Sequence, residues 1–203
     1  MKLGPRYKIC KRLGSGVFEK CQTQAFQLSE ARSLKNKAKR RRRPGSEYNR
    51  QLIEKQKLRI MYGLTEKQFA GYVARALENR ENPHETLFQA LESRLDSIVY
   101  RMGLAGTRRM ARQLVSHGHI TVNGRKVTVP SYQVKTTDRI AIREGSRGSA
   151  LFANAHERLA EYAAPSWVVF DPGTFEGALK QVPAFTDQDT GVDIQAVFEY
   201  YTR

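Results

Sequence analysis

The stretch RRMARQLVSHGHITVNGRK, residues 108–126, combines guanidinium groups with short polar side chains and a tight turn. Guanidinium groups bind phosphate oxygens through paired hydrogen bonds, and amide, hydroxyl and imidazole groups donate to sugar and phosphate oxygens. These groups hold a polyanion without making or breaking covalent bonds, so the chemistry that they indicate is phosphate binding. The candidate residues are Arg108, Arg109, Arg112, Gln113, Ser116, His117, Asn123, Arg125 and Lys126.

Two further groups of cations lie earlier in the chain. Arg40, Arg41, Arg42 and Arg43 form a run of four arginines in KNKAKRRRRPG, and such blocks repel themselves until a polyanion orders them. A solubilising tail is the alternative interpretation, although a tail does not require arginine. The second group lies in an expected helix and consists of Arg50, Lys55, Lys57 and Arg59.

Composition agrees with a polyanionic partner. The 203 residues are 40% hydrophobic, which is enough for a core, and 35 Lys and Arg oppose 20 Asp and Glu for a net charge of +15. Such charge favours nucleic acid or an anionic membrane surface. No apolar run approaches the roughly 18–20 residues that span a bilayer, and the basic helices lack a large apolar face. We therefore expect nucleic acid and no membrane.

The charge is distributed unevenly along the chain. Residues 1–59 contain 18 Lys and Arg against 4 Asp and Glu, whereas residues 157–203 contain 3 against 8. The acidic end predicts a second surface, which faces either another protein or the basic parts of the same chain.

Local signals predict the elements that position these cations. Ser46 is a suitable N-cap for a helix that Gly63 ends, and Thr65 with Gln68 forms a capping box for the next helix. A third helix is expected over residues 83–103. The apolar stripes of all three helices are expected to form core.

The candidate phosphate-binding stretch follows these helices. Thr107 can cap a helix that carries its arginines on one outer face and ends at Gly118. Asn123-Gly124 predicts a type I′ hairpin, with Ile120 and Val122 on the first strand and Val127 and Val129 alternating on the return strand. RIAIRE predicts a further strand. Helix and hairpin would then share one basic face.

The stretch LESRLDSIVYRMGLAGTRRMARQLVSHGHITVNGRKVTVPSYQV resembles the RNA-binding module of the ribosomal protein S4 family. That module also occurs in pseudouridine synthases, tyrosyl-tRNA synthetases and a heat-shock RNA-binding protein. Three further stretches resemble the ribosomal family in particular: RQLIEKQKLRIMYGLTEKQF, PSWVVFDPGTFEGALKQVP and VDIQAVFEYYTR.

The resemblance implies an α+β fold, with a mainly helical first domain and an inserted module of helix, helix, β-hairpin and strands. We expect a basic N-terminal extension over residues 1–45 that is ordered on RNA. The helical domain would cover residues 46–90 and be completed by about 181–203, and the module would cover residues 91–180.

The resemblance also implies a role. Members of the family are structural components of the small ribosomal subunit in the cytoplasm. They bind a multi-helix junction of small-subunit ribosomal RNA and nucleate assembly. They lie near the path by which mRNA enters, and they contact protein S5, a contact linked to decoding accuracy. The alternatives are a free-standing RNA-binding regulator and an RNA-modifying enzyme that uses the same module, but the chain shows no catalytic motif.

We expect no metal and no other cofactor. Some relatives carry a four-cysteine zinc knuckle near the N-terminus, but here Tyr7 occupies the position that would partner Cys10, and Cys21 is the only other cysteine. Two cysteines exclude a disulfide scaffold and fit a reducing cytosol. Without a zinc knuckle, RNA and packing must hold the N-terminal extension, so we expect it to be disordered in the free protein. His117 and His119 lack a Cys or carboxylate at ligand spacing.

Overall fold

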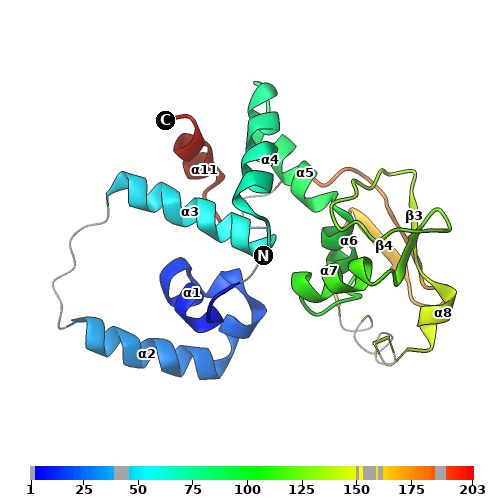
Figure 1. Ribbon diagram of the computed structural model, residues 1–203, viewed down its shortest axis with the longest axis horizontal. Helices are drawn as coiled ribbons and strands as arrows, with labels where there is room; N and C mark the ends of the chain where they lie inside the picture. The colour runs from blue at the N-terminus through cyan, green and yellow to red at the C-terminus, as the bar shows by residue number, and fades with distance from the viewer. Residues whose placement is uncertain (1–2, 39–45, 150, 153–158, 160–161, 186–190) are drawn as a thin grey trace. The chain divides into compact units, whose positions relative to one another are not determined.

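The computed structural model describes residues 3–38, 46–149, 151–152, 159, 162–185 and 191–203. The arginine run at positions 40–43 therefore lies outside the described residues. The chain divides into two compact units, one of residues 1–84 with 186–203 and one of residues 85–185. The first is helical and the second combines helices with a sheet, so the predicted α+β class is confirmed (Figure 1).

The helical unit is built around α3, and its predicted caps are confirmed. The Ser46 hydroxyl accepts a hydrogen bond from the Asn49 amide at 3.3 Å, and Thr65 and Gln68 form the reciprocal capping box of α4. Gly63 follows α3 with φ of 63°. The elements of the unit are α1 (Arg6–Leu13), η1 (Ser15–Val17), η2 (Glu19–Gln22), α2 (Gln24–Ala38), α3 (Glu47–Met61), α4 (Glu66–Glu78) and α11 (Ile194–Tyr201).

The C-terminal helix α11 packs on the basic helix α3 (Figure 1), so Glu199 and the capping residue Asp193 lie beside α3. Gln51 Nε2 donates to Glu199 Oε2 at 2.9 Å. Glu66 Oε1 accepts hydrogen bonds from Lys55 Nζ at 2.7 Å and from the Tyr201 hydroxyl at 2.9 Å. The Lys55 ammonium also lies 4.2 Å from the centroid of the Tyr200 ring.

Residues 3–38 of the expected N-terminal extension contain regular structure. Helices α1 and α2 form there, and α1 contacts α3. Cys10 and Cys21 are joined by a disulfide and form a small buried core with Phe26, against which Tyr7 packs. The expectation of reduced thiols did not anticipate this pair, because the two cysteines come from different elements, α1 and η2.

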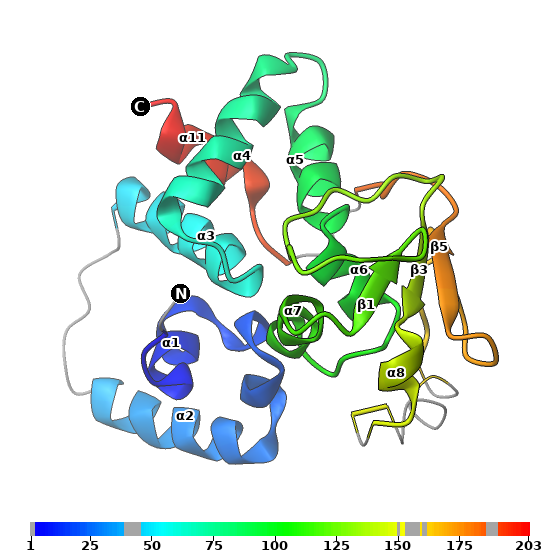
Figure 2. The ribbon, with the colours of Figure 1, turned by 45° about the vertical axis from the view of Figure 1, so that its right-hand side comes forward.

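The second unit is a layer of helices on one face of an antiparallel sheet (Figure 2). The strand order is β2-β1-β3-β5-β4, so the late hairpin β4–β5 extends the sheet that begins with the basic hairpin β1–β2. The elements are α5 (Pro83–Glu92), α6 (Leu95–Arg101), α7 (Arg108–Ser116), β1 (Ile120–Val122), β2 (Arg125–Lys126), β3 (Arg139–Ile142), α8 (Glu144–Arg147), β4 (Val168–Asp171) and β5 (Glu176–Leu179).

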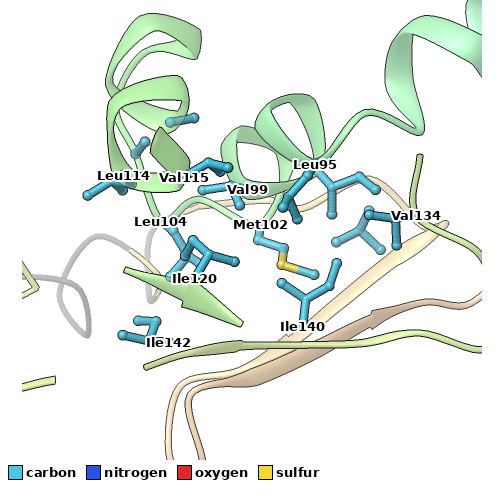
Figure 3. Packing of buried hydrophobic residues seen from close by; sticks show 14 of the residues in the cluster. Leu95, Val99, Met102, Leu104, Leu114, Val115, Ile120, Val134, Ile140 and Ile142 are labelled. Carbon is cyan, nitrogen blue, oxygen red and sulfur yellow. The ribbon is translucent and has the colours of Figure 1, made fainter. Parts of the chain in front are cut away.

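Helices α6 and α7 supply one side of the core, and β1 and β3 supply the other. Figure 3 shows these side chains between the helices and the strands: Leu95, Val99, Met102, Leu114 and Val115 lie opposite Ile120, Ile140 and Ile142. This burial fixes the orientation of α7, because its apolar stripe must face the sheet. The opposite face of α7 and the hairpin tip are left for function.

Two predicted elements of this unit need correction. The helix expected over residues 83–103 is two helices, because Arg94 adopts extended backbone and forms a β-bridge with Gln133. The return strand of the hairpin ends at Lys126, and Val129 is 54% exposed instead of buried. Val127 still donates a backbone hydrogen bond to Ile120 of β1 at 3.3 Å, and the chain then turns to the start of α6, where the Pro130 carbonyl accepts from the Asp96 amide.

We predict that reduction of the Cys10–Cys21 disulfide destabilises residues 3–38 by about 2–4 kcal/mol, as expected for closure of a short loop. Amide hydrogen exchange in α1 should then accelerate on adding dithiothreitol. The matched control is the double variant Cys10→Ser with Cys21→Ser, whose exchange should be fast with or without reductant. Unchanged exchange in the reduced parent chain would contradict the prediction.

The Glu66 contacts predict a pH dependence of stability. Burial opposes ionisation of Glu66, but hydrogen bonds from Lys55 and Tyr201 and the charges of Lys55 and Arg59 outweigh it, so its pKa lies below its ordinary value of 4.5. Because the pKa of Glu66 is lower in the folded protein than its ordinary value, ionised Glu66 stabilises the fold at pH values above 4.5. This stabilisation is lost as the pH falls through the lowered pKa. The stability difference between the parent chain and Glu66→Gln, measured by urea unfolding, should therefore shrink below pH 4.5. Glu78→Gln, at the exposed end of the same helix, should show no such trend.

Candidate nucleic-acid interface

A buried carboxylate at the start of α6 holds two of the arginines. Asp96 accepts from Arg94 Nε at 3.0 Å and Arg94 Nη2 at 2.9 Å, and from Arg112 Nε at 2.9 Å and Arg112 Nη2 at 2.7 Å. One carboxylate between two guanidiniums leaves one net positive charge in the cluster. Arg112 keeps 29% of its side chain exposed and therefore remains within reach of a ligand.

A second cluster repeats this arrangement at the end of α5. Glu92 is fully buried and accepts from Arg101 Nε at 3.0 Å and Nη2 at 2.8 Å, and from Arg108 Nη2 at 2.8 Å. The Arg108 guanidinium also lies 4.8 Å from the centroid of the Tyr100 ring. This cluster again carries one net positive charge. Only 14% of the Arg108 side chain is exposed.

The prediction that three arginines of α7 share an outer face is therefore wrong for two of them. Arg109 is exposed, whereas Arg108 and Arg112 turn toward Glu92 and Asp96. The cause is non-local, because the carboxylates come from α5 and α6 and cannot stay buried without cationic partners. Helical spacing alone did not contain this information.

The rest of the predicted stretch is exposed on α7 and the hairpin. Exposed residues there are Arg109, Gln113, Ser116, His117, Asn123, Arg125 and Lys126. Asn123 and Gly124 have φ of 50° and 76°, as a type I′ turn requires. The Asn123 side chain is already used within the fold, since its Nδ2 donates to Asp138 Oδ1 at 2.8 Å and its Oδ1 accepts from the Arg139 amide at 2.9 Å. It anchors the hairpin to β3, which sequence reasoning did not predict.

The hairpin is also held against the end of α7. Gly118 follows α7 with φ of 75°, and a Cβ at this position would overlap the Lys126 side chain. The Lys126 ammonium thus lies near the negative end of the helix dipole. Helix and hairpin present their cations from one fixed surface.

Most cations of α3 have partners inside the helical unit. Lys55 is buried and pairs with Glu66, Lys57 Nζ lies 2.6 Å from Glu54 Oε1, and Arg59 Nε lies 3.4 Å from Glu66 Oε2. The expectation that these three face RNA is corrected for Lys55, whose charge serves the packing of α11. Arg50 is exposed, although it contacts Glu47 at 3.0 Å.

The two histidines of the HGH stretch do not gather ligands around them. Their ring centroids lie 6.2 Å apart, and His119 Nδ1 lies 2.9 Å from the Ser146 hydroxyl. Within the part of the chain that the structure describes, no group of three or more His, Cys, Asp or Glu residues could hold a metal ion. In the same part, no helix is long and apolar enough to cross a membrane.

Sequence reasoning missed the other guanidiniums of the two clusters, which are the buried Arg94 and the mostly buried Arg101. A charge signal could have found the region, because residues 97–137 contain seven Lys or Arg and no Asp or Glu. The two nearest acidic residues on the N-terminal side are Glu92 and Asp96, both of which the fold buries. The arrangement can bind polyanions through the exposed cations of α7 and the hairpin.

Two family models match adjoining parts of the chain. Residues 2–92 match the family described as "Ribosomal protein S4/S9 N-terminal domain", and residues 93–140 match the "S4 domain". The curated protein "Small ribosomal subunit protein uS4" of Limosilactobacillus reuteri subsp. reuteri (strain JCM 1112) is 43% identical over 204 residues, covering 98% of each chain. The protein of the same name from Limosilactobacillus reuteri (strain DSM 20016) is also 43% identical over the same shares.

The two family matches adjoin at residues 92 and 93, and together they span most of the chain. The curated relatives align over nearly the full length of both sequences. The chain therefore belongs to the ribosomal protein S4 family, as the resemblance of its sequence motifs predicted.

Proposed function

We propose that this chain is a structural, non-enzymatic protein of the small ribosomal subunit that binds ribosomal RNA through α7 and the β1–β2 hairpin. The observation that carries the proposal is the acid-free stretch of residues 97–137, whose cations lie on a rigid layer of helix and hairpin. The names of the curated relatives support the ribosomal role over a free-standing regulator or an RNA-modifying enzyme.

The proposed mechanism uses shape and charge. RNA helices have a deep, narrow major groove that side chains cannot read, so proteins recognise phosphates, 2′-hydroxyls and the path of the backbone. Arg109, Arg125 and Lys126 are exposed cations that would contact phosphates directly. Gln113, Ser116 and His117 are exposed on the same helix end and would donate to sugar and phosphate oxygens.

The two buried carboxylates give the interface its rigidity. Each fixes two guanidiniums in one geometry before RNA arrives, which lowers the entropy lost on binding. Because each cluster keeps one net positive charge, Arg112 and Arg101 still attract phosphate. Glu92 and Asp96 are therefore proposed as positioning residues of the RNA interface.

The finer role follows the family resemblance. We propose that the RNA target is a multi-helix junction and that binding nucleates assembly. The run Arg40–Arg43 would order on RNA or lie beside the path of incoming mRNA. A contact with protein S5 would link the chain to decoding accuracy. A structure of the assembled small subunit that contains this chain tests all of these assignments.

We predict that Arg109→Ala combined with Arg125→Ala and Lys126→Ala weakens binding to a junction RNA and flattens its salt dependence. Each lost phosphate contact should reduce the slope of log K against log salt by roughly 0.7–0.9, and the fold should be retained because the three side chains are exposed. Filter binding from 50 to 200 mM salt measures the slope. Lys180→Ala is the matched control, since Lys180 is exposed beside β5, toward the other edge of the sheet. An unchanged slope in the triple variant would count against this interface.

Asp96→Asn should behave differently, because it leaves two guanidiniums at a buried site without their carboxylate. We expect a loss of roughly 3–5 kcal/mol in unfolding free energy. Urea unfolding measures the loss, and Glu144→Gln, an exposed carboxylate of the same unit, should be close to neutral. A variant of full stability would show that Asp96 does not hold Arg94 and Arg112 in solution.

A further inference from the structure

Residues 127–135, which connect the hairpin toward β3, expose two apolar side chains beside the cationic surface. Val129 is 54% exposed and Tyr132 is 37% exposed. The Tyr132 amide donates to the Val129 carbonyl at 3.1 Å, so the two residues stand at the ends of one turn. We refer to Val129 and Tyr132 as the apolar rim.

The backbone of this segment is fixed to the α5–α6 junction. The carbonyls of Pro130 and Tyr132 accept hydrogen bonds from the amides of Asp96 at 3.2 Å and Leu95 at 2.9 Å. The Val134 amide donates to the Ser93 carbonyl at 2.9 Å, and Val134 itself is buried in the core. These backbone hydrogen bonds fix the position of the segment while the side chains of the apolar rim stay exposed.

The surroundings of the rim are cationic. The Asp96 amide donates a hydrogen bond to the Pro130 carbonyl, between Val129 and Tyr132 in the chain, and the Asp96 carboxylate binds Arg112, whose side chain is 29% exposed. Lys135 is exposed at the end of the segment. A ligand that suits both features carries negative charge together with flat, apolar faces, and a nucleotide has this combination.

We propose that Tyr132, with Val129 beside it, is a stacking site for one unpaired nucleotide of the bound RNA. The inference rests on the proposed function and goes further, because it assigns a contact to a base where the cations contact only phosphates. In a duplex the faces of the bases are covered by their neighbours, so an aromatic ring reaches only bases that are unpaired or terminal. The rim would therefore select RNA that has unpaired nucleotides next to its helices.

The test compares Tyr132→Ala and Tyr132→Phe in the full-length chain. With a junction RNA that contains unpaired nucleotides, Tyr132→Ala should weaken binding on the order of tenfold, and Tyr132→Phe should keep parental affinity because its ring is retained. Tyr132→Ala should leave the salt slope unchanged, since no charge is removed. With a fully paired duplex of the same length, Tyr132→Ala should bind as the parent does. Val169→Ala, which shortens an exposed apolar side chain on β4, is the matched control.

A fluorescence measurement locates the contact. A 2-aminopurine base placed at successive unpaired positions should change its emission on binding at one position with the parent chain and with Tyr132→Phe. The same position should give no change with Tyr132→Ala at saturating protein. Far-ultraviolet circular dichroism confirms that the variants are folded.

The outcomes separate this inference from the proposed function. If the parent chain shows no salt-dependent binding to the junction RNA, the proposed function fails. If the parent binds and Tyr132→Ala binds equally well, only the stacking site is overturned. A Tyr132→Ala variant that binds RNA normally but loses a protein neighbour in the assembled subunit would also overturn it, because the rim would then be a protein contact.

Discussion

The constraint on which the second unit depends is the need to neutralise two buried carboxylates. Glu92 and Asp96 lie on either side of the break between α5 and α6, and neither can remain ionised inside the protein without cationic partners. Their partners come from different elements: Arg101 ends α6, and Arg108 and Arg112 lie on α7. The ion pairs therefore tie α5, α6 and α7 to one another, while the apolar core ties α6 and α7 to the sheet. Two independent sets of contacts thus fix the orientation of α7.

The same constraint shapes the surface. The backbone amide of Asp96 binds the segment after the hairpin, and its side chain binds the arginines, so one residue links the hairpin exit to the cationic face. Arg108 and Arg112 are partly buried by these ion pairs, whereas Arg109, Arg125 and Lys126 are exposed. We infer that the guanidiniums paired with Glu92 and Asp96 provide fixed geometry, whereas the exposed cations Arg109, Arg125 and Lys126 provide long-range attraction.

Local sequence signals predict where helices and turns begin and end, but they do not predict contacts between residues that are distant in the sequence. The Thr65 capping box, the Thr107 cap and the Asn123-Gly124 turn depend on residues within four positions of one another, so the sequence predicted them correctly. The break at Arg94 was missed because it depends on a bridge to Gln133, which is 39 positions away. Position in a basic helix predicts that Lys55 is a surface cation, but its partners Tyr200 and Tyr201 lie at the far end of the chain. The Cys10–Cys21 pair is closer in sequence, with a separation of 11 positions, but spacing alone does not show that the turns of η1 and η2 bring the two cysteines together.

Between residues 92 and 137 the negative charges are buried and the exposed charges are positive. From Glu92 to Thr137 the chain contains two carboxylates, and the fold places both under arginines instead of on the surface. An approaching phosphate thus meets no exposed carboxylate from this stretch, although the negative charges still contribute by holding guanidiniums in place. A surface that merely accumulated lysines would attract a polyanion equally well at long range, but it would not resist reorganisation on contact. The buried carboxylates thus convert general attraction into a cationic surface of fixed shape, which shape-based recognition of folded RNA requires.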